Sequence, residues 1–290
     1  MTAEDIYKNE SYLIRRKIKN RVMLSLCYLA AILAVVPLIY IFFYTTASGF
    51  NALNADFFTQ LPAPVGEEGG GMANAIVGTI ILVGLGSAVG IPIGVLAGIY
   101  VSEYSNSFFS NIVKFVTDVL SGVPSIIIGI FAYGVIVIPM GNFSAYAGGF
   151  ALGILMIPTV TRTTEEMLKL VPHTLREASL ALGVSRWKTT LRVVLKTASA
   201  GIITGILLAI ARAAGETAPL LFTAFGNRFW SDSLDQPIAS LPVQIFTYAI
   251  SPYKDWHEQA WAGAFVLIFL VFVVNLLVRL VTRNKFTANL

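Results

Sequence analysis

Six long apolar stretches, separated by charged residues and by glycine and proline turns, dominate the chain. They lie near residues 22–44, 72–101, 112–138, 144–161, 198–226 and 259–281. A helix needs roughly 20 consecutive apolar residues to cross a hydrocarbon core of about 30 Å. The pattern therefore predicts an all-α integral membrane protein with six transmembrane helices, and the first is expected to be a retained signal anchor.

Composition supports this assignment. Of the 290 residues, 56% are hydrophobic and 12% are charged, and the mean hydropathy is +0.74. These values exclude a water-soluble enzyme core and an intrinsically disordered chain. The one cysteine, Cys27, can form no internal disulfide.

The positions of the basic residues predict the orientation. With a cytoplasmic N-terminus, seventeen of the 20 Lys and Arg residues fall in inner segments, and only Arg228 and Lys254 fall in outer loops. This positive-inside pattern predicts that both termini are cytoplasmic. The net charge of +4 therefore reflects topology in membrane lipid, and nucleic acid is not expected as a partner. The outer loops hold seven acidic residues, so they do not attract an anion from solution.

Small residues recur every four positions in two of the spans. These positions are Gly86, Gly90, Gly94 and Gly98 in the second span and Gly201, Gly205, Ala209 and Ala213 in the fifth. Ridges of this kind let helix backbones approach closely. They predict packing faces, either within the chain or against a partner.

The polar loop at residues 163–196 is expected to form helices on the membrane surface. A first helix is predicted to begin at Thr164 and to end at Pro172. A second covers residues 175–183 and ends in a glycine that suits the left-handed conformation. Ser185 is a candidate cap for a third helix that continues into the fifth span. The short middle helix fits either a docking element for a partner or an amphipathic hairpin on lipid headgroups.

Two charged residues are predicted inside the fifth span. Arg212 lies near mid-membrane, where a lone arginine would cost at least about 2.5 kcal/mol. Glu216, four residues on, shares its helix face. The two form either a self-neutralising structural pair or part of an anion path, in which Glu216 restrains Arg212 until substrate competes. Lys114 and Asp118 are expected to form a second, interfacial pair.

Two further segments are distinctive. Residues 121–125 (Ser-Gly-Val-Pro-Ser) form either an unwound stretch that lines a cavity or a proline kink within the third span. Residues 240–251 predict a short amphipathic helix outside the membrane, capped by Ser240.

The loop motif resembles that of a known family. It reads Glu177-Ala178-Ser179-x3-Gly183-x9-Val193-x-Leu195, which is similar to the EAA loop of bacterial ABC importer permeases, E-A-A-x3-G-x9-I-x-L-P. Ser179 replaces the second alanine, and Lys196 stands where the family usually has proline. Residues 121–125, 171–183, 215–220 and 241–244 resemble the permease subunits of phosphate importers, the PstA type.

The resemblance implies a type I ABC importer permease fold with a cytoplasmic coupling helix. With the hydropathy and charge pattern, it divides the chain into a cytoplasmic segment (1–21), a first transmembrane helix with an outer loop (22–71), a permease domain (72–281, with the EAA loop at 162–197) and a cytoplasmic tail (282–290). The implied ATPase-coupling residues are Glu177, Ala178, Ser179 and Gly183. The candidate translocation path comprises Arg212, Glu216, Ser121 and Ser125.

The function implied by the resemblance is import of inorganic phosphate across the bacterial inner membrane. The implied partners are a second permease subunit (PstC-like), two ATPase subunits (PstB-like) that use ATP and Mg, and a periplasmic phosphate-binding protein (PstS-like). This chain has no Gly-Lys dipeptide and hence no phosphate loop, so neither ATP hydrolysis nor a cofactor of its own is expected. His173 and His257 are predicted on opposite sides of the membrane, so no metal site is expected. Import of another substrate, such as molybdate or an amino acid, and transport by the chain alone remain alternatives.

Overall fold

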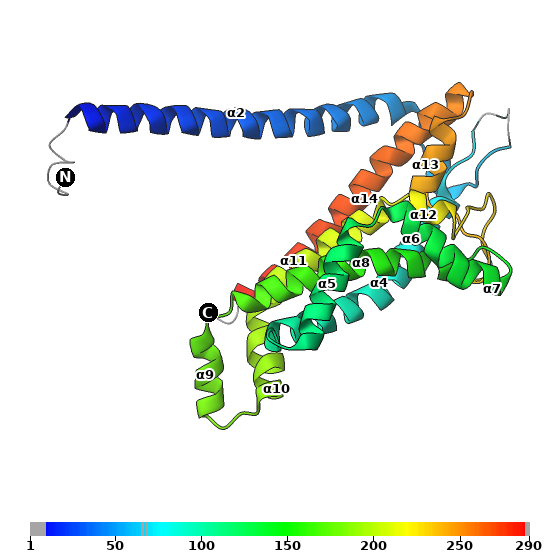
Figure 1. Ribbon diagram of the computed structural model, residues 1–290. Coiled ribbons are helices and arrows are strands. Elements are labelled where there is room, and N and C mark those ends of the chain that lie inside the picture. The colour runs from blue at the N-terminus through cyan, green and yellow to red at the C-terminus, as the bar shows by residue number, and fades with distance from the viewer. Residues whose placement is uncertain (1–9, 65–66, 68, 288–290) are drawn as a thin grey trace. The chain divides into compact units, whose positions relative to one another are not determined.

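The computed structural model describes residues 10–64, 67 and 69–287. The chain divides into two compact units, Met1–Ser48 and Gly49–Leu290. The described residues of the first unit lie in helix α2 (Glu10–Gly49), drawn in blue in Figure 1. This helix is long and apolar enough to cross a membrane, as predicted for the first span. Residues 1–9 of the predicted cytoplasmic segment 1–21 lie outside the described residues.

The second unit is built from helices of very different lengths (Figure 1). They are η1 (Phe50–Ala52), α3 (Ala55–Thr59), α4 (Ala73–Glu103), α5 (Phe108–Gly122), α6 (Ser125–Ala132), η2 (Tyr133–Val137), α7 (Ile138–Met140), α8 (Ala145–Lys169), α9 (His173–Ala181), α10 (Arg186–Thr189), η3 (Thr190–Val194), α11 (Leu195–Ala214), α12 (Ala218–Leu221), α13 (Leu241–Ala249) and α14 (Lys254–Thr287). The all-α fold class is therefore as predicted.

Four helices of the described residues are long and apolar enough to span a membrane, or up to five if the bent pair α5 to α7 counts as one span. They are α2, α4, the continuous α10 to α11, and α14. Helix α8 occupies the position of the predicted fourth span but is not among them. Fifteen of its 25 residues are buried, and many of these are glycine, alanine or threonine. A helix enclosed by other helices does not need the strongly apolar surface that lipid requires.

The glycine ridge of α4 packs directly on α8. A Cβ atom added to Gly90 would lie 2.7 Å from the carbonyl oxygen of Gly153, and one added to Gly94 would lie 2.7 Å from Cβ of Val160. Side chains do not tolerate such distances, so only glycine permits this helix spacing. The ridge on α4 serves a contact within the chain.

The second ridge also contacts α8. A Cβ atom added to Gly201 would meet the side chain of Met167, and one added to Gly205 would meet Thr163. Ala209 and Ala213, which continue the ridge along α11, are 2% and 3% exposed. Both predicted packing faces therefore converge on one helix, α8.

The third predicted span is two helices that meet at a sharp break. Helix α5 begins after Ser107, whose hydroxyl accepts a hydrogen bond from the backbone N–H of Ser110 at 3.0 Å. It ends where Val123 and Pro124 adopt extended conformations, and the helices on either side are bent by 106°. Proline supplies no N–H for a helical hydrogen bond and disfavours a helical conformation of the residue before it. The third span, predicted over 112–138, is therefore interrupted at residues 123 and 124, within the segment 121–125 where the sequence predicts an unwound stretch or a proline kink.

The sequence predicts the fifth span over 198–226, but the helix in the structure ends twelve residues earlier. Helix α11 stops at Ala214, and the four-residue helix α12 follows after a turn at Gly215. Glycine has a low helix propensity, and Pro219 occupies the first turn of α12, where its missing N–H is tolerated. The apolar run of the sequence continues past the end of the helix.

Replacing Gly90 by alanine is expected to destabilise the protein, because the added methyl group collides with the backbone of α8. Overpacking of this kind costs about 1–3 kcal/mol. The thermal unfolding midpoint of the purified protein should therefore fall. Gly84→Ala is the matched control on the same helix, because nothing lies within 4 Å of its added Cβ atom. Equal midpoints for the two variants would contradict the packing described here.

Candidate functional site

The predicted coupling segment forms a helical hairpin, α9 and α10, between α8 and α11 (Figure 1). Helix α9 begins after Pro172 and ends two residues before Gly183. Gly183 has a φ of 77°, the left-handed conformation predicted for it, which glycine adopts without strain. Ser185 takes the predicted N-cap position of α10, but its hydroxyl makes no capping hydrogen bond.

The start of this loop differs from the prediction, whereas its end agrees with it. No helix starts at Thr164, because α8 runs on to Lys169. Thr164 is fully buried against Gly98 of α4, so the helix packing extends beyond the predicted end of the span. At the other end, α10 continues through the π-helical turn η3 into α11, with Lys196 in the first turn of α11. Lysine in place of proline leaves every backbone N–H in this turn available to the helix.

Three contacts fix the side of the hairpin that faces α4 and α8. Arg176 of α9 forms an ion pair with Glu103, the last residue of α4. The same arginine donates a hydrogen bond to the carbonyl oxygen of Leu168 in α8 at 3.2 Å. Ser179 and Thr189 share a buried hydroxyl hydrogen bond of 2.9 Å between α9 and α10. These contacts hold α9 against the ends of α4 and α8.

The other side of α9 is open. Glu177, Ala178 and Gly183 are exposed, and the adjacent Leu182 is 84% exposed. Exposed apolar and small residues beside a carboxylate suit an element that inserts into a groove of a partner. Ser179, the fourth predicted coupling residue, is instead buried and turned toward α10. In the structure it positions α9.

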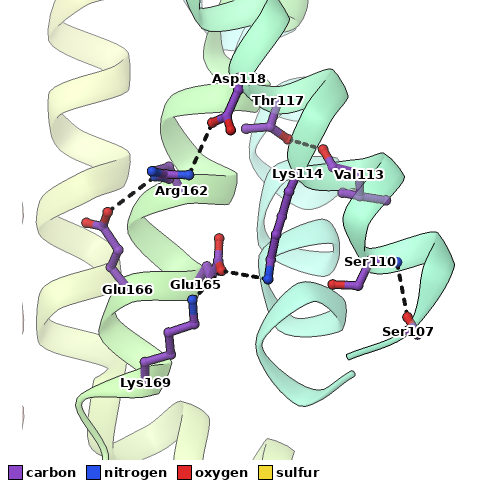
Figure 2. Close-up of polar contacts among 10 residues, drawn as sticks. All are labelled: Ser107, Ser110, Val113, Lys114, Thr117, Asp118, Arg162, Glu165, Glu166 and Lys169. Carbon is purple, nitrogen blue, oxygen red and sulfur yellow. Dashed lines mark hydrogen bonds and ion pairs between the residues drawn. The ribbon is translucent and has the colours of Figure 1, made fainter. Parts of the chain in front are cut away.

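A network of charges joins α5 to the end of α8 that leads to the hairpin (Figure 2). Lys114 of α5 lies 3.7 Å from the carboxylate of Glu165, which Lys169 also contacts. Glu165 is 4% exposed, and this buried carboxylate is compensated by two lysines whose own side chains reach solvent. Asp118 of α5 contacts Arg162 of α8 at 3.1 Å. The structure thus pairs Lys114 and Asp118 with α8 rather than with each other, because α5 packs alongside α8.

Arg212 and Glu216 form the ion pair that their spacing predicts. Arg212 Nε lies 3.6 Å from Glu216 Oε1, and the side chains are 53% and 16% exposed. The sequence predicts both residues on one face of the same helix. Helix α11 ends between them at Ala214, so Glu216 instead reaches Arg212 from the turn that follows the helix. The pair lies at the end of α11 where the helix is broken.

The two predicted path serines lie on either side of the α5–α6 break. Ser121 donates a hydrogen bond to the carbonyl oxygen of Thr117 at 2.9 Å. In the described part of the chain, no hydrogen bond or ion pair joins Ser121 or Ser125 to Arg212 and Glu216. The helices beyond the two breaks do meet, because a Cβ atom added to Gly129 of α6 would lie 2.6 Å from Cα of Pro219 in α12.

Several residues of the site, among them Glu103 and Glu165, are absent from the sequence prediction. Glu165 has a local signal, since Lys169 follows it by one helical turn. Glu103 has none, because it lies 73 residues from Arg176. The residues that the structure describes include no group of three or more His, Cys, Asp or Glu side chains placed to hold a metal ion.

Residues 90–286 match the family of binding-protein-dependent transport system inner membrane components. The chain belongs to this family. The match runs from within α4 to within α14, so it includes the hairpin, the charged network and the Arg212 pair. This permease is therefore a multi-pass inner membrane protein and a transport subunit of an ABC system, with ATPase activity in a separate subunit.

The permease resembles phosphate transport system permease proteins PstA along most of its length. It is 48% identical to the Haemophilus influenzae protein over 272 residues, which cover 93% of this chain and 96% of that protein. It is 45% identical to the Yersinia pestis protein, with 93% and 92% covered. The Mycobacterium tuberculosis protein PstA 1 is 37% identical, with 91% and 88% covered.

A solved structure confirms the fold. A chain of the MetNI methionine ABC transporter, in an inward-facing conformation (CY5 native crystal form), superposes with a TM-score of 0.56. The two are 19% identical, and the match covers 73% of this chain and 92% of that chain. At this identity the likeness concerns the fold alone, which is the predicted ABC importer permease fold.

Glu165→Gln should destabilise the permease more than Glu166→Gln. The Glu165 side chain is 6% exposed and serves two lysines, whereas Glu166 is 58% exposed and contacts Arg162 at 3.4 Å. Exposed pairs contribute at most about 1 kcal/mol. Loss of the Glu165 carboxylate should cost about 1–2 kcal/mol, because both lysines keep some contact with solvent. Thermal unfolding midpoints measure the difference, and a larger shift for Glu166→Gln would contradict the assignment of the network.

Proposed function

We propose that this chain is one of two permease subunits of an ATP-driven importer that moves inorganic phosphate into the bacterial cell. The hairpin α9–α10 is the observation that carries the proposal. It is anchored on one side by Arg176 and Ser179 and open on the other at Glu177 and Gly183. The choice of phosphate rests on the names of the relatives, which are phosphate transport system permease proteins.

The proposed assembly is the one that the resemblance to phosphate importers implies. It contains a second permease subunit (PstC-like), two ATPase subunits (PstB-like) that use ATP and Mg, and a periplasmic phosphate-binding protein (PstS-like). The excess of Lys and Arg in the inner segments supports cytoplasmic positions for both termini and for the hairpin. The acidic outer loops fit delivery of phosphate by a carrier protein rather than capture from solution.

The anchors of the hairpin supply a route from ATP hydrolysis to the membrane. Movement of an ATPase subunit that grips α9 is passed to α4 through the Arg176–Glu103 ion pair and to α8 through the carbonyl of Leu168. Because both small-residue ridges pack on α8, α4 and α11 respond together with it. The breaks at residues 123–124 and at Gly215 are the places where the backbone can change direction.

Arg212 is the proposed cation of the translocation path. About half of its side chain is exposed on the surface of the chain, although it lies in an apolar helix. An arginine that faced lipid there would cost at least about 2.5 kcal/mol, so it should face the second permease subunit or a water-filled path. Glu216, 3.6 Å away, balances its charge when no anion is bound. Arginine suits phosphate because its planar N–H groups bind two oxygens at once.

Uptake of labelled phosphate in cells that lack only this chain tests the function and the docking side together. The wild-type chain should restore uptake, and molybdate or sulfate should not compete. Gly183→Asp should abolish uptake and association with the ATPase, because it places a charged side chain on the docking side in a strained left-handed conformation.

Gly141→Asp is the matched control for Gly183→Asp. Both glycines have a φ near 76°, and nothing lies within 4 Å of an added Cβ atom at either position. Gly141 lies outside the hairpin, so its variant should retain uptake. If cells with Gly183→Asp took up phosphate normally, the docking role of α9 would be wrong. If the wild-type chain restored no uptake, the assignment of phosphate as the substrate would be wrong.

Arg212→Lys tests whether Arg212 binds the anion in the translocation path or only forms a structural ion pair with Glu216. Lysine retains the charge and the pairing with Glu216 but loses two-point binding of an oxyanion. We expect phosphate uptake to fall by about tenfold, the effect of losing one charge-assisted hydrogen bond. Arg192→Lys, at an exposed position outside the proposed path, is the control for arginine loss. Near-normal uptake by Arg212→Lys would favour the structural pair.

A further inference from the structure

A pocket lined by both apolar and polar side chains lies on the side of the chain predicted to face the periplasm. Its volume is about 190 Å³, and it lies between helix α13 and the segment that follows α12. Its lining includes the polar side chains of Asn227, Arg228, Ser240, Gln244 and Tyr248. None of these residues belongs to the hairpin or to the proposed path at Arg212.

The charge of this pocket differs from that of its surroundings. The outer loops are predicted to hold seven acidic residues against two basic ones. The pocket lining contains one of the two basic residues, Arg228, and no carboxylate. An otherwise acidic face therefore has a local site that favours an anion.

The backbone that carries Arg228 is fixed in an unusual conformation. Phe225 has a φ of 62°, which is rare for a bulky residue. Its ring stacks on Phe143 with 4.6 Å between centroids. Asn74 at the start of α4 donates a hydrogen bond to the carbonyl oxygen of Asn227 at 2.6 Å. A strained conformation held by several contacts is typical of a preorganised site.

The side chain of Arg228 is oriented as well. Its guanidinium lies over the ring of Trp256, 5.4 Å from the centroid. This cation–π contact restrains the guanidinium beside the ring, and the exposed Arg228 can offer its planar N–H groups to an anion. No carboxylate forms a salt bridge with Arg228 within the described part of the chain.

Helix α13 supplies further polar groups. Ser240 takes its N-cap position and is 1% exposed, yet its hydroxyl has no hydrogen-bond partner among the described residues. A buried hydroxyl without a partner is uncommon, and Ser240 lines the pocket, so its hydroxyl can donate a hydrogen bond to an anion there. Burial raises the pKa of Tyr248, which keeps its phenol neutral, and its hydrogen bond with Gln244 opposes this effect.

We infer that this pocket is a capture site for a small oxyanion on its way into the path, with the Arg228 guanidinium as the principal ligand. The identity of the anion, phosphate, rests on the proposed function. Through its positive charge, the pocket would retain an anion that a carrier protein releases at an otherwise acidic outer face. It would hold phosphate before the anion reaches Arg212.

The test uses the full transporter in proteoliposomes with its binding protein, and measures labelled phosphate taken up per ATP hydrolysed. Arg228→Gln should lower this ratio at least about tenfold. Arg228→Lys, which retains the charge but not the planar N–H edge, should give an intermediate ratio. Lys254→Gln is the matched control, because Lys254 is the other outer cation and does not line the pocket. It should transport phosphate as the wild type does.

The outcomes separate this inference from the proposed function. A normal ratio for Arg228→Gln overturns the capture site while phosphate import by the wild type stands. A wild-type transporter that imports no phosphate overturns the proposed function itself. If Arg228→Gln weakens binding of the loaded and the empty binding protein equally, the pocket docks that protein and the inference is wrong. If Arg228→Gln does not assemble, Gln244→Leu on the facing wall provides the same test, with the same expected loss.

Discussion

The close approach of α8 to α4 and α11 is the constraint on which the rest of the structure depends. Gly90 and Gly94 leave no room for a Cβ atom between α4 and α8, and Gly205 leaves none between α11 and α8. In lipid, helices associate through such close packing because the acyl chains are as apolar as the helices, so the hydrophobic effect does not drive the helices together. The same packing explains why α8 can lie inside the bundle with a sequence too poor in large apolar residues to be counted as a span.

The site depends on this packing because its fixed points lie at the end of α8. Glu165 and Arg162 hold α5 there, and the carbonyl of Leu168 accepts a hydrogen bond from Arg176 of the hairpin. The hairpin therefore does not move on its own: a displacement of α9 is shared with α4 and α8. Arg212 lies at the far end of α11, which joins the same packed group of helices through Gly205.

Periodicity and local residue chemistry predict much of this arrangement. The glycine ridges, the short helix of the hairpin and the left-handed Gly183 follow from spacing and from backbone preference. The ends of α8 and α11 do not, because tertiary packing extends the first past Thr164, and an apolar run continues beyond the second. The Arg176–Glu103 pair cannot be read from the sequence at all, since it depends on which helix ends are neighbours in space.

On the proposed function, this chain transports phosphate only as part of an ATP-driven assembly. The most direct measurement compares labelled phosphate uptake by proteoliposomes that contain the chain alone with uptake by the full assembly, with and without ATP. We expect no uptake by the chain alone, with or without an ion gradient, and accumulation by the assembly only when ATP is hydrolysed. Gradient-driven uptake by the chain alone would overturn the proposed function and identify a stand-alone transporter.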